Sequence, residues 1–139
     1  MQPSQVLFQG EALPRALPVC DHYAGTEVRM RKALALQAEL GPVFDITFDC
    51  EDGAPVGKEA EHAQLVADIL LSSDNRFNRV GVRIHDPSHS CWKADVATLI
   101  KQAGKKIAYF PIGEPDLSAM QPSQEFMQWL NEAASQRYK

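Results

Sequence analysis

The sequence FDITFDCEDGAPVGK, residues 44–58, decides the fold of this chain. Its first five residues are a β-prone run, which is followed by three carboxylates, Asp49, Glu51 and Asp52. A turn rich in Gly and Pro comes next and a helical pattern begins at Glu59, so we expect a strand, an acidic turn and a helix. Carboxylates crowded at the carboxyl end of a strand repel one another, and such a cluster usually holds a cation or a proton. Alternatively, Asp49 or Asp52 only binds the amides of the turn and the other carboxylates face water.

The same strand–helix order recurs along the chain. Apolar, β-prone runs predict strands at residues 16–20, 44–48, 79–84 and 106–110. Apolar residues at helical spacing predict helices at residues 26–40, with Thr26 as the cap, at 59–71, at 92–103 and from Ser123 onward. Four such repeats joined by right-handed crossovers give a (βα)4 parallel sheet with helices packed on it. We expect a loose arm rich in Pro and Gln at residues 1–15 and one α/β domain at residues 16–139.

The composition predicts a soluble globular protein with a sizeable core, because 45% of the 139 residues are hydrophobic and 23% are charged. The formal net charge of −4 gives no support for a nucleic-acid partner, which calls for a basic patch. The apolar stretches are too short to cross a bilayer, and the N-terminus has no secretory-signal pattern, so we expect no membrane partner. Three cysteines without close paired spacing, Cys20, Cys50 and Cys91, predict reduced thiols in a cytoplasmic protein.

The loops that follow the four predicted strands all lie at the carboxyl edge of the predicted sheet. In chain order, their polar residues are Asp21, His22 and Tyr23; Asp49, Glu51 and Asp52; Arg83, His85 and His89; and Glu114 and Asp116. Polar groups that converge on one edge are what a small-molecule site needs. Arg83 ends an apolar strand, so its guanidinium fork either grips a carboxylate or carbonyl of a substrate or forms an ion pair with Glu51 or Asp52.

Three other patterns carry less weight. Lys58 and the helix start beside it can attract an anion, but the turn at residues 53–57 lacks the P-loop spacing and its Ser/Thr, which excludes nucleotide hydrolysis. Zinc-ligand residue types occur at Cys20, His22, His85, His89 and Cys91. No CxxC or HExxH spacing accompanies them, so we do not favour a zinc site. Tyr109 is expected to pack in the core or against a helix.

Several of these stretches resemble the HpcH/HpaI aldolase and citrate lyase β-chain family. Residues 45–58 are similar to its D-x-x-x-D-L-E-D-A-x-x-P-x-x-K segment through Asp45, Asp49, Glu51, Asp52 and Lys58. VRIH at 82–85 and WKADV at 92–96 are similar to the strand and helix that follow in the family. IAYFPIGE at 107–114 resembles a degraded L-P-K-x-E strand end, and VCDHYAG at 19–25 resembles a CitE-like subgroup. The ordered set covers residues 16 to about 115 and corresponds to the N-terminal half of the family pattern.

The resemblance implies a TIM barrel that breaks or forms a carbon–carbon bond with Mg²⁺ assistance. The enzyme would be a lyase or aldolase acting on a 2-oxo or 3-hydroxy acid or its CoA thioester. Arg83 is then the residue that binds the substrate carboxylate and oxo group and stabilises the developing enolate. Glu51 and Asp52 are catalytic candidates that lie beside the metal and its waters, and Glu114 is a weaker metal candidate. The further candidates for substrate binding are His22, Tyr23, Lys58 and His85.

The chain also departs from the family pattern. It carries four of the eight strand–helix units of a TIM barrel, which needs about 250 residues, and the family's direct metal ligands come from later strands. His85 replaces the family's Asn, Ile112 its Lys and His62 its Arg. The alternative is therefore a non-catalytic truncated homologue or a module that binds an anion or a metal. A half-barrel leaves two sheet edges unpaired, so we expect either a homo-oligomer that closes a barrel-like assembly or a last helix that covers the open face.

Overall fold

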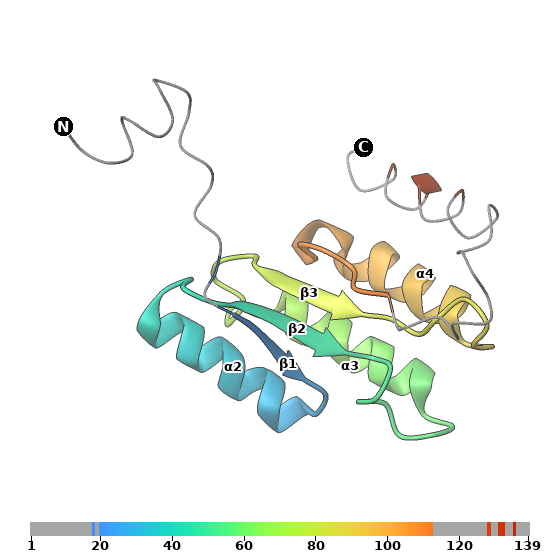
Figure 1. Cartoon of the computed structure of the whole chain (residues 1–139), viewed down its shortest axis with the longest axis horizontal. Coiled ribbons are helices and arrows are strands. Elements are labelled where there is room, and N and C mark those ends of the chain that lie inside the picture. The colour runs from blue at the N-terminus through green and yellow to red at the C-terminus, as the bar shows by residue number, and fades with distance from the viewer. Residues whose placement is uncertain (1–17, 19, 113–127, 129–130, 133–134, 136–139) are drawn as a thin grey trace.

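The computed structural model describes residues 18, 20–112, 128, 131–132 and 135 (Figure 1). The predicted arm at residues 1–15 and the candidates Glu114 and Asp116 lie outside these residues. Of the predicted last helix, positions 128, 131, 132 and 135 are described, and each is helical.

Three parallel strands form the sheet in the order β1–β2–β3, and each is followed by a helix. The strands are β1 (Asp21–Ala24), β2 (Asp45–Asp49) and β3 (Val80–Arg83). The helices are α2 (Glu27–Leu40), α3 (Glu59–Leu71) and α4 (Trp92–Ala103), and the short 3₁₀ helix η1 (Gly104–Lys106) follows α4. The parallel pairing and the β–α order confirm the predicted α/β class, and the described part is a partial fold of that class (Figure 1).

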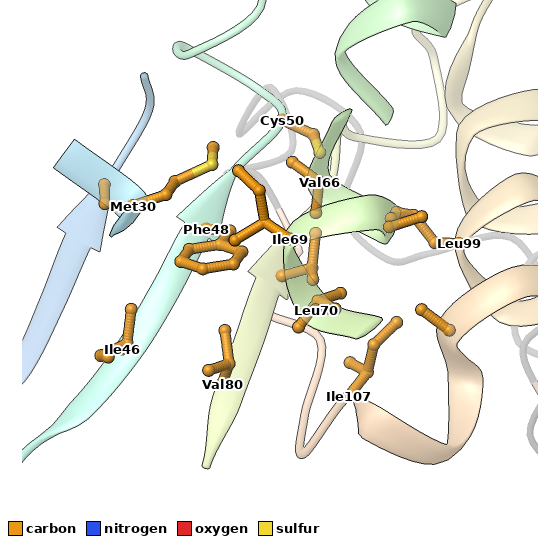
Figure 2. Close-up of a cluster of buried hydrophobic side chains, with 14 of the residues drawn as sticks. Met30, Ile46, Phe48, Cys50, Val66, Ile69, Leu70, Val80, Leu99 and Ile107 are labelled. Carbon is orange, nitrogen blue, oxygen red and sulfur yellow. The ribbon is translucent and has the colours of Figure 1, made fainter. Parts of the chain in front are cut away.

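The hydrophobic core lies between the sheet and the helices (Figure 2). Side chains alternate along a strand, so the fully buried Ile46 and Phe48 face the helices, whereas Thr47 and Asp49 belong to the opposite face of the sheet. The helices bury Met30, Leu34, Val66, Ile69, Leu70 and Leu99 against β2 and β3. Full burial of each such side chain stabilises the fold by about 1.5–3 kcal/mol, so this layer holds the strands in register.

The helix boundaries agree with the predicted ranges for physical reasons. α2 ends before Gly41, whose φ of 82° lies in the region that favours glycine, and Pro42 follows it. Thr26 takes the N-cap position as expected, but its side chain makes no capping hydrogen bond. Its carbonyl instead accepts the first helical bond, from the Met30 amide at 2.8 Å. No helix in the described part of the chain is long and apolar enough to cross a membrane.

The prediction for the first strand was wrong in its position. Residues 21–25 were predicted as a loop, but β1 spans Asp21–Ala24. Of the predicted strand at residues 16–20, positions 18 and 20 are described, and neither belongs to a strand. Pairing with β2 starts where the Asp45 amide donates to the Cys20 carbonyl at 3.0 Å, and it continues from Asp21 to Ala24. Among the four residues of β1 only Ala24 is buried, so this strand has no apolar run that a sequence pattern could detect.

The predicted fourth strand at residues 106–110 is not a regular strand. Lys106 belongs to η1, and the residues that follow run parallel to β3 through isolated bridges, Val80 with Ile107 and Ile84 with Ile112. The Ile84 amide donates to the Pro111 carbonyl at 3.0 Å, but proline has no amide to donate in return. The segment therefore occupies the place of a fourth strand with an interrupted ladder.

Tyr109, which was expected to pack in the core or against a helix, instead lies across the face of the sheet that is opposite the helices. Its hydroxyl is 3.1 Å from Thr47 Oγ1 and donates to Asp21 Oδ1 at 3.1 Å. The ring passes over Gly81, because a Cβ at that position would lie 2.2 Å from Tyr109 Cε2. A glycine in β3 thus makes room for the only aromatic ring that bridges β1, β2 and β3 within residues 20–112.

Candidate functional site

Arg83 and three carboxylates form the centre of the candidate site. The register pairs Asp49 with Arg83, so the carboxyl ends of β2 and β3 lie side by side. Arg83 binds Asp49 through two parallel bonds, Nε to Oδ1 at 2.9 Å and Nη2 to Oδ2 at 2.7 Å. Its Nη1 is 2.9 Å from Glu51 Oε2, and its Nη2 also donates to Asp52 Oδ2. The predicted ion pair is therefore present, and we call these four residues the Arg83 cluster.

Asp49 was predicted as part of the acidic turn but was given no catalytic, substrate-binding or metal-binding role. Its Oδ1 accepts the backbone amides of Glu51 at 3.0 Å and Asp52 at 3.2 Å, so it shapes the acidic turn while it holds Arg83. Asp49 does bind the turn amides, but the alternative in which it does only this and the other carboxylates face water is wrong, because Asp49 and Glu51 both bind Arg83. The sequence shows Asp49 at the end of a β-prone run, but its place beside Arg83 follows from the register of β2 with β3.

The end of β1 and helix α3 hold the acidic turn in place from two sides. A Cβ at Gly53 would lie 2.2 Å from the Asp49 carbonyl oxygen and 2.6 Å from Gly25 Cα, so the turn packs backbone to backbone on the end of β1. From the other side, His62 of α3 bonds the Asp49 carbonyl through Nε2 at 3.0 Å. The carboxylates are thus presented by a supported turn.

The electrostatics of the Arg83 cluster favour a further positive charge. Three carboxylates face one guanidinium, which gives a formal net charge of −2. Burial raises the pKa of Glu51, and the charge of Arg83 offsets part of that rise. The hydrogen bonds that Arg83 donates to Asp49 raise the pKa of Arg83 above its ordinary value, so the guanidinium stays charged. Asp52 is 77% exposed and is the carboxylate that water or a ligand reaches most easily.

Tyr23 is the only other predicted substrate-binding residue in contact with the Arg83 cluster within residues 20–112. Arg83 Cζ lies 5.4 Å from the centre of the Tyr23 ring, within cation–π range. His22 pairs with Ile46 and alternates to the other side of β1, so the structure does not bring it to the cluster. Lys58 takes the N-cap position of α3, and its ammonium is 3.9 Å from Glu61. Neither His22 nor Lys58 is joined to the cluster.

His85 forms a second polar group beside the cluster. It follows β3, and its Nδ1 lies 3.4 Å from Oδ2 of Asp95 in the first turn of α4. The two side chains are 8% and 3% exposed. The His85 ring stacks on His89 with 3.9 Å between ring centres and 12° between planes. Burial raises the pKa of Asp95, and His85 lowers it in part.

The metal-ligating potential of the described residues is limited. Among them, no group of three or more His, Cys, Asp or Glu side chains is placed to hold a metal ion. Cys20, Cys50 and Cys91 are free thiols, and burial raises the pKa of Cys50. Glu51 and Asp52 are the carboxylates expected beside a metal, and both are paired with Arg83. These residues offer at most part of a ligand set for Mg²⁺.

Comparison with known proteins identifies a solved relative. A citrate lyase from Burkholderia xenovorans LB400 is 48% identical and superposes with a TM-score of 0.76. The match covers 88% of this chain but 38% of that chain, so the chain spans well under half the length of the citrate lyase. No family model and no curated protein matches this sequence. The narrower assignment to the HpcH/HpaI family stays a prediction, and the match supports a citrate lyase-like family for a chain whose fold corresponds to a fragment of that structure.

Proposed function

We propose that this chain is part of a carbon–carbon lyase or aldolase that acts on a 2-oxo or 3-hydroxy acid or its CoA thioester with Mg²⁺ assistance. The observation that carries this proposal is the 48% identity to a citrate lyase. The Arg83 cluster at the carboxyl ends of β2 and β3 supports it, because α/β folds place their chemistry at that edge.

Arg83 would bind the acidic substrate and stabilise the enolate that develops when the bond breaks. Its two bonds to Asp49 fix the orientation of the guanidinium, while the exposed Asp52 shares Nη2 and can give way to a substrate carboxylate. A guanidinium oriented before the reaction stabilises developing negative charge without the cost of reorganisation. Tyr23 covers one face of the same group and would limit how the substrate approaches.

Mg²⁺ would polarise the substrate carbonyl when bound. Mg²⁺ in proteins commonly takes one or two carboxylates and keeps several waters, and Glu51 and Asp52 are the described carboxylates suited to bind those waters. The remaining ligands would come from the substrate, from water or from residues outside the described part of the chain.

The test is cleavage of citramalyl-CoA and malyl-CoA by the full chain with and without Mg²⁺. We expect Mg²⁺-dependent turnover that Arg83→Ala lowers by about 10²–10³-fold, the usual effect of removing one group that stabilises a developing oxyanion. Arg31→Ala is the matched control, because Arg31 lies on α2 and pairs with Glu27 at the surface. Absence of turnover, or equal turnover in Arg83→Ala and Arg31→Ala, would contradict the proposal.

A second candidate function is a non-catalytic module that binds an anion or a metal. The Arg83 cluster favours it, because a guanidinium that is oriented by carboxylates can hold an anion or share a cation without any reaction. Titration calorimetry with oxaloacetate and with Mg²⁺ separates the two functions. Binding that requires Arg83, without any cleavage, would support the module.

We also propose that the chain assembles as a homo-oligomer. β1 pairs with β2 on one side, and its other side has no strand partner among the described residues. An unpaired edge readily accepts a strand from another chain. Size-exclusion chromatography with light scattering should therefore give the mass of a dimer or a larger assembly, and a well-folded monomer would argue against it.

A further inference from the structure

We propose that His85 and Asp95 form an acid–base pair of the same site, in which Asp95 orients the imidazole and His85 exchanges a proton with the substrate through Nε2. This inference rests on the proposed function, because it assigns the proton-transfer step of that reaction. It concerns two residues from different elements, the loop after β3 and the first turn of α4.

The geometry of the pair is the first support. His85 Nδ1 and Asp95 Oδ2 are 3.4 Å apart, both atoms are buried, and neither has a hydrogen-bond partner among the described residues. A buried carboxylate without a partner is costly, so each of these atoms is the natural partner of the other. Hydrogen bonds of this kind are often long in the free protein and shorten when a ligand is bound. With Nδ1 turned toward Asp95, Nε2 lies on the opposite side of the ring.

The stacked His89 ring is the second support. His89 Nδ1 accepts the backbone amide of Cys91 at 3.3 Å, so the start of α4 holds the His89 ring in place. The His85 ring stacks on it with 3.9 Å between ring centres, which fixes the plane of His85. The stack and Asp95 together orient the imidazole of His85.

The acidic residues around the pair are the third support. Glu51 in the acidic turn, Glu59 of α3, Asp86 in the loop after β3 and Asp95 of α4 all interact electrostatically with His85. Glu51 also binds Arg83, so it connects the imidazole to the Arg83 cluster.

The proposed step is balanced without any additional reactant. In the cleavage of a 3-hydroxy acid, His85 Nε2 removes the proton of the hydroxyl group, and the O–H electron pair forms the new carbonyl. The carbon–carbon bond breaks, and its electron pair becomes the enolate beside Arg83. The imidazolium then returns the proton to the enolate carbon.

Two measurements test this step, the first of which needs no turnover. Nitrogen-15 NMR of the full chain reports which ring nitrogen of His85 carries the proton, and we expect Nδ1. Asp95→Asn should change the ring to the Nε2–H form, because the amide of Asn can donate to Nδ1. Asp68→Asn is the matched control, since Asp68 is an exposed aspartate on α3. An Nε2–H form in the wild-type chain would overturn the pair.

The second measurement is the pH dependence of cleavage. His85→Gln should lower kcat by about 10²–10⁴-fold, leave KM nearly unchanged and remove the loss of activity on the acidic side of the profile. An unchanged profile in His85→Gln would overturn the proton-transfer role while the proposed function stands. If the wild-type chain shows no turnover, the proposed function and the proton transfer both fail, and the NMR result still decides whether Asp95 orients His85.

Discussion

Replacing Asp49 by Asn removes one charge and one acceptor from the centre of the Arg83 cluster. The variant keeps the oxygen that accepts the amides of Glu51 and Asp52 and Arg83 Nε, but it loses the negative charge and the 2.7 Å bond from Arg83 Nη2 to Oδ2. A hydrogen bond to a charged group contributes about 1.5–3 kcal/mol. Because Arg83 keeps two other carboxylates and is 23% exposed, we expect a loss of about 2 kcal/mol in the free energy of unfolding.

Urea denaturation at pH 7, followed by circular dichroism, measures this loss. Asp45→Asn is a close control, because Asp45 and Arg79 form the corresponding pair at the other end of β2 and β3, with both nitrogen–oxygen distances at 2.7 Å. That pair is more exposed, because the exposed fraction of the side chain is 31% for Arg79 and 19% for Asp45. Its loss should therefore lower the free energy of unfolding by about 1 kcal/mol or less. Equal losses in the two variants would refute the reasoning that burial and bidentate geometry make the Asp49 pair the stronger one.

Two further predictions concern the opposite face of the sheet and the acidic turn. Gly81→Ala places a Cβ against the Tyr109 ring and should lower the free energy of unfolding by about 1–3 kcal/mol in urea denaturation; an unchanged stability would show that the ring moves freely. Burial raises the pKa of Glu51, so its contribution to stability is present at low pH and is lost as the pH rises through the raised value. The free energy of unfolding of Glu51→Gln should therefore rise relative to that of the wild type as the pH is raised from about 4 to about 7. A difference between the two that is independent of pH would contradict this.

The helices and two of the three strands could be predicted because local chemistry decides them. α2 ends where Gly41 takes a positive φ, and α3 runs over the predicted residues 59–71. β1 could not be predicted in this way, since three of its four residues are exposed and its pairing depends on β2. The irregular segment beside β3 was mistaken for a strand because the sequence shows apolar residues but not the broken ladder at Pro111.

The residues of the candidate site that lie at the ends of predicted strands could be identified from the sequence. Arg83 ends β3 and the acidic turn follows β2, and the structure brings them together. The role of Asp49 depends on the register of β2 with β3, which the sequence does not contain. The partner of His85 is ten positions further along the chain, at the start of α4, and only the packing of that helix shows the pair.

The charge balance of the site connects these separate features. The Arg83 cluster has a formal net charge of −2, yet the proposed substrates are acids and add more negative charge. At an effective dielectric constant near 20, two like charges about 4 Å apart repel by about 4 kcal/mol, so Arg83 alone does not offset an incoming carboxylate. Additional positive charge is required, and in the proposals Mg²⁺ supplies it, because His85 is uncharged until it accepts the proton of the substrate hydroxyl group. Both act next to Glu51, which touches Arg83 on one side and feels the imidazole on the other. Glu51 is therefore the residue through which substrate binding, metal binding and proton transfer would depend on one another.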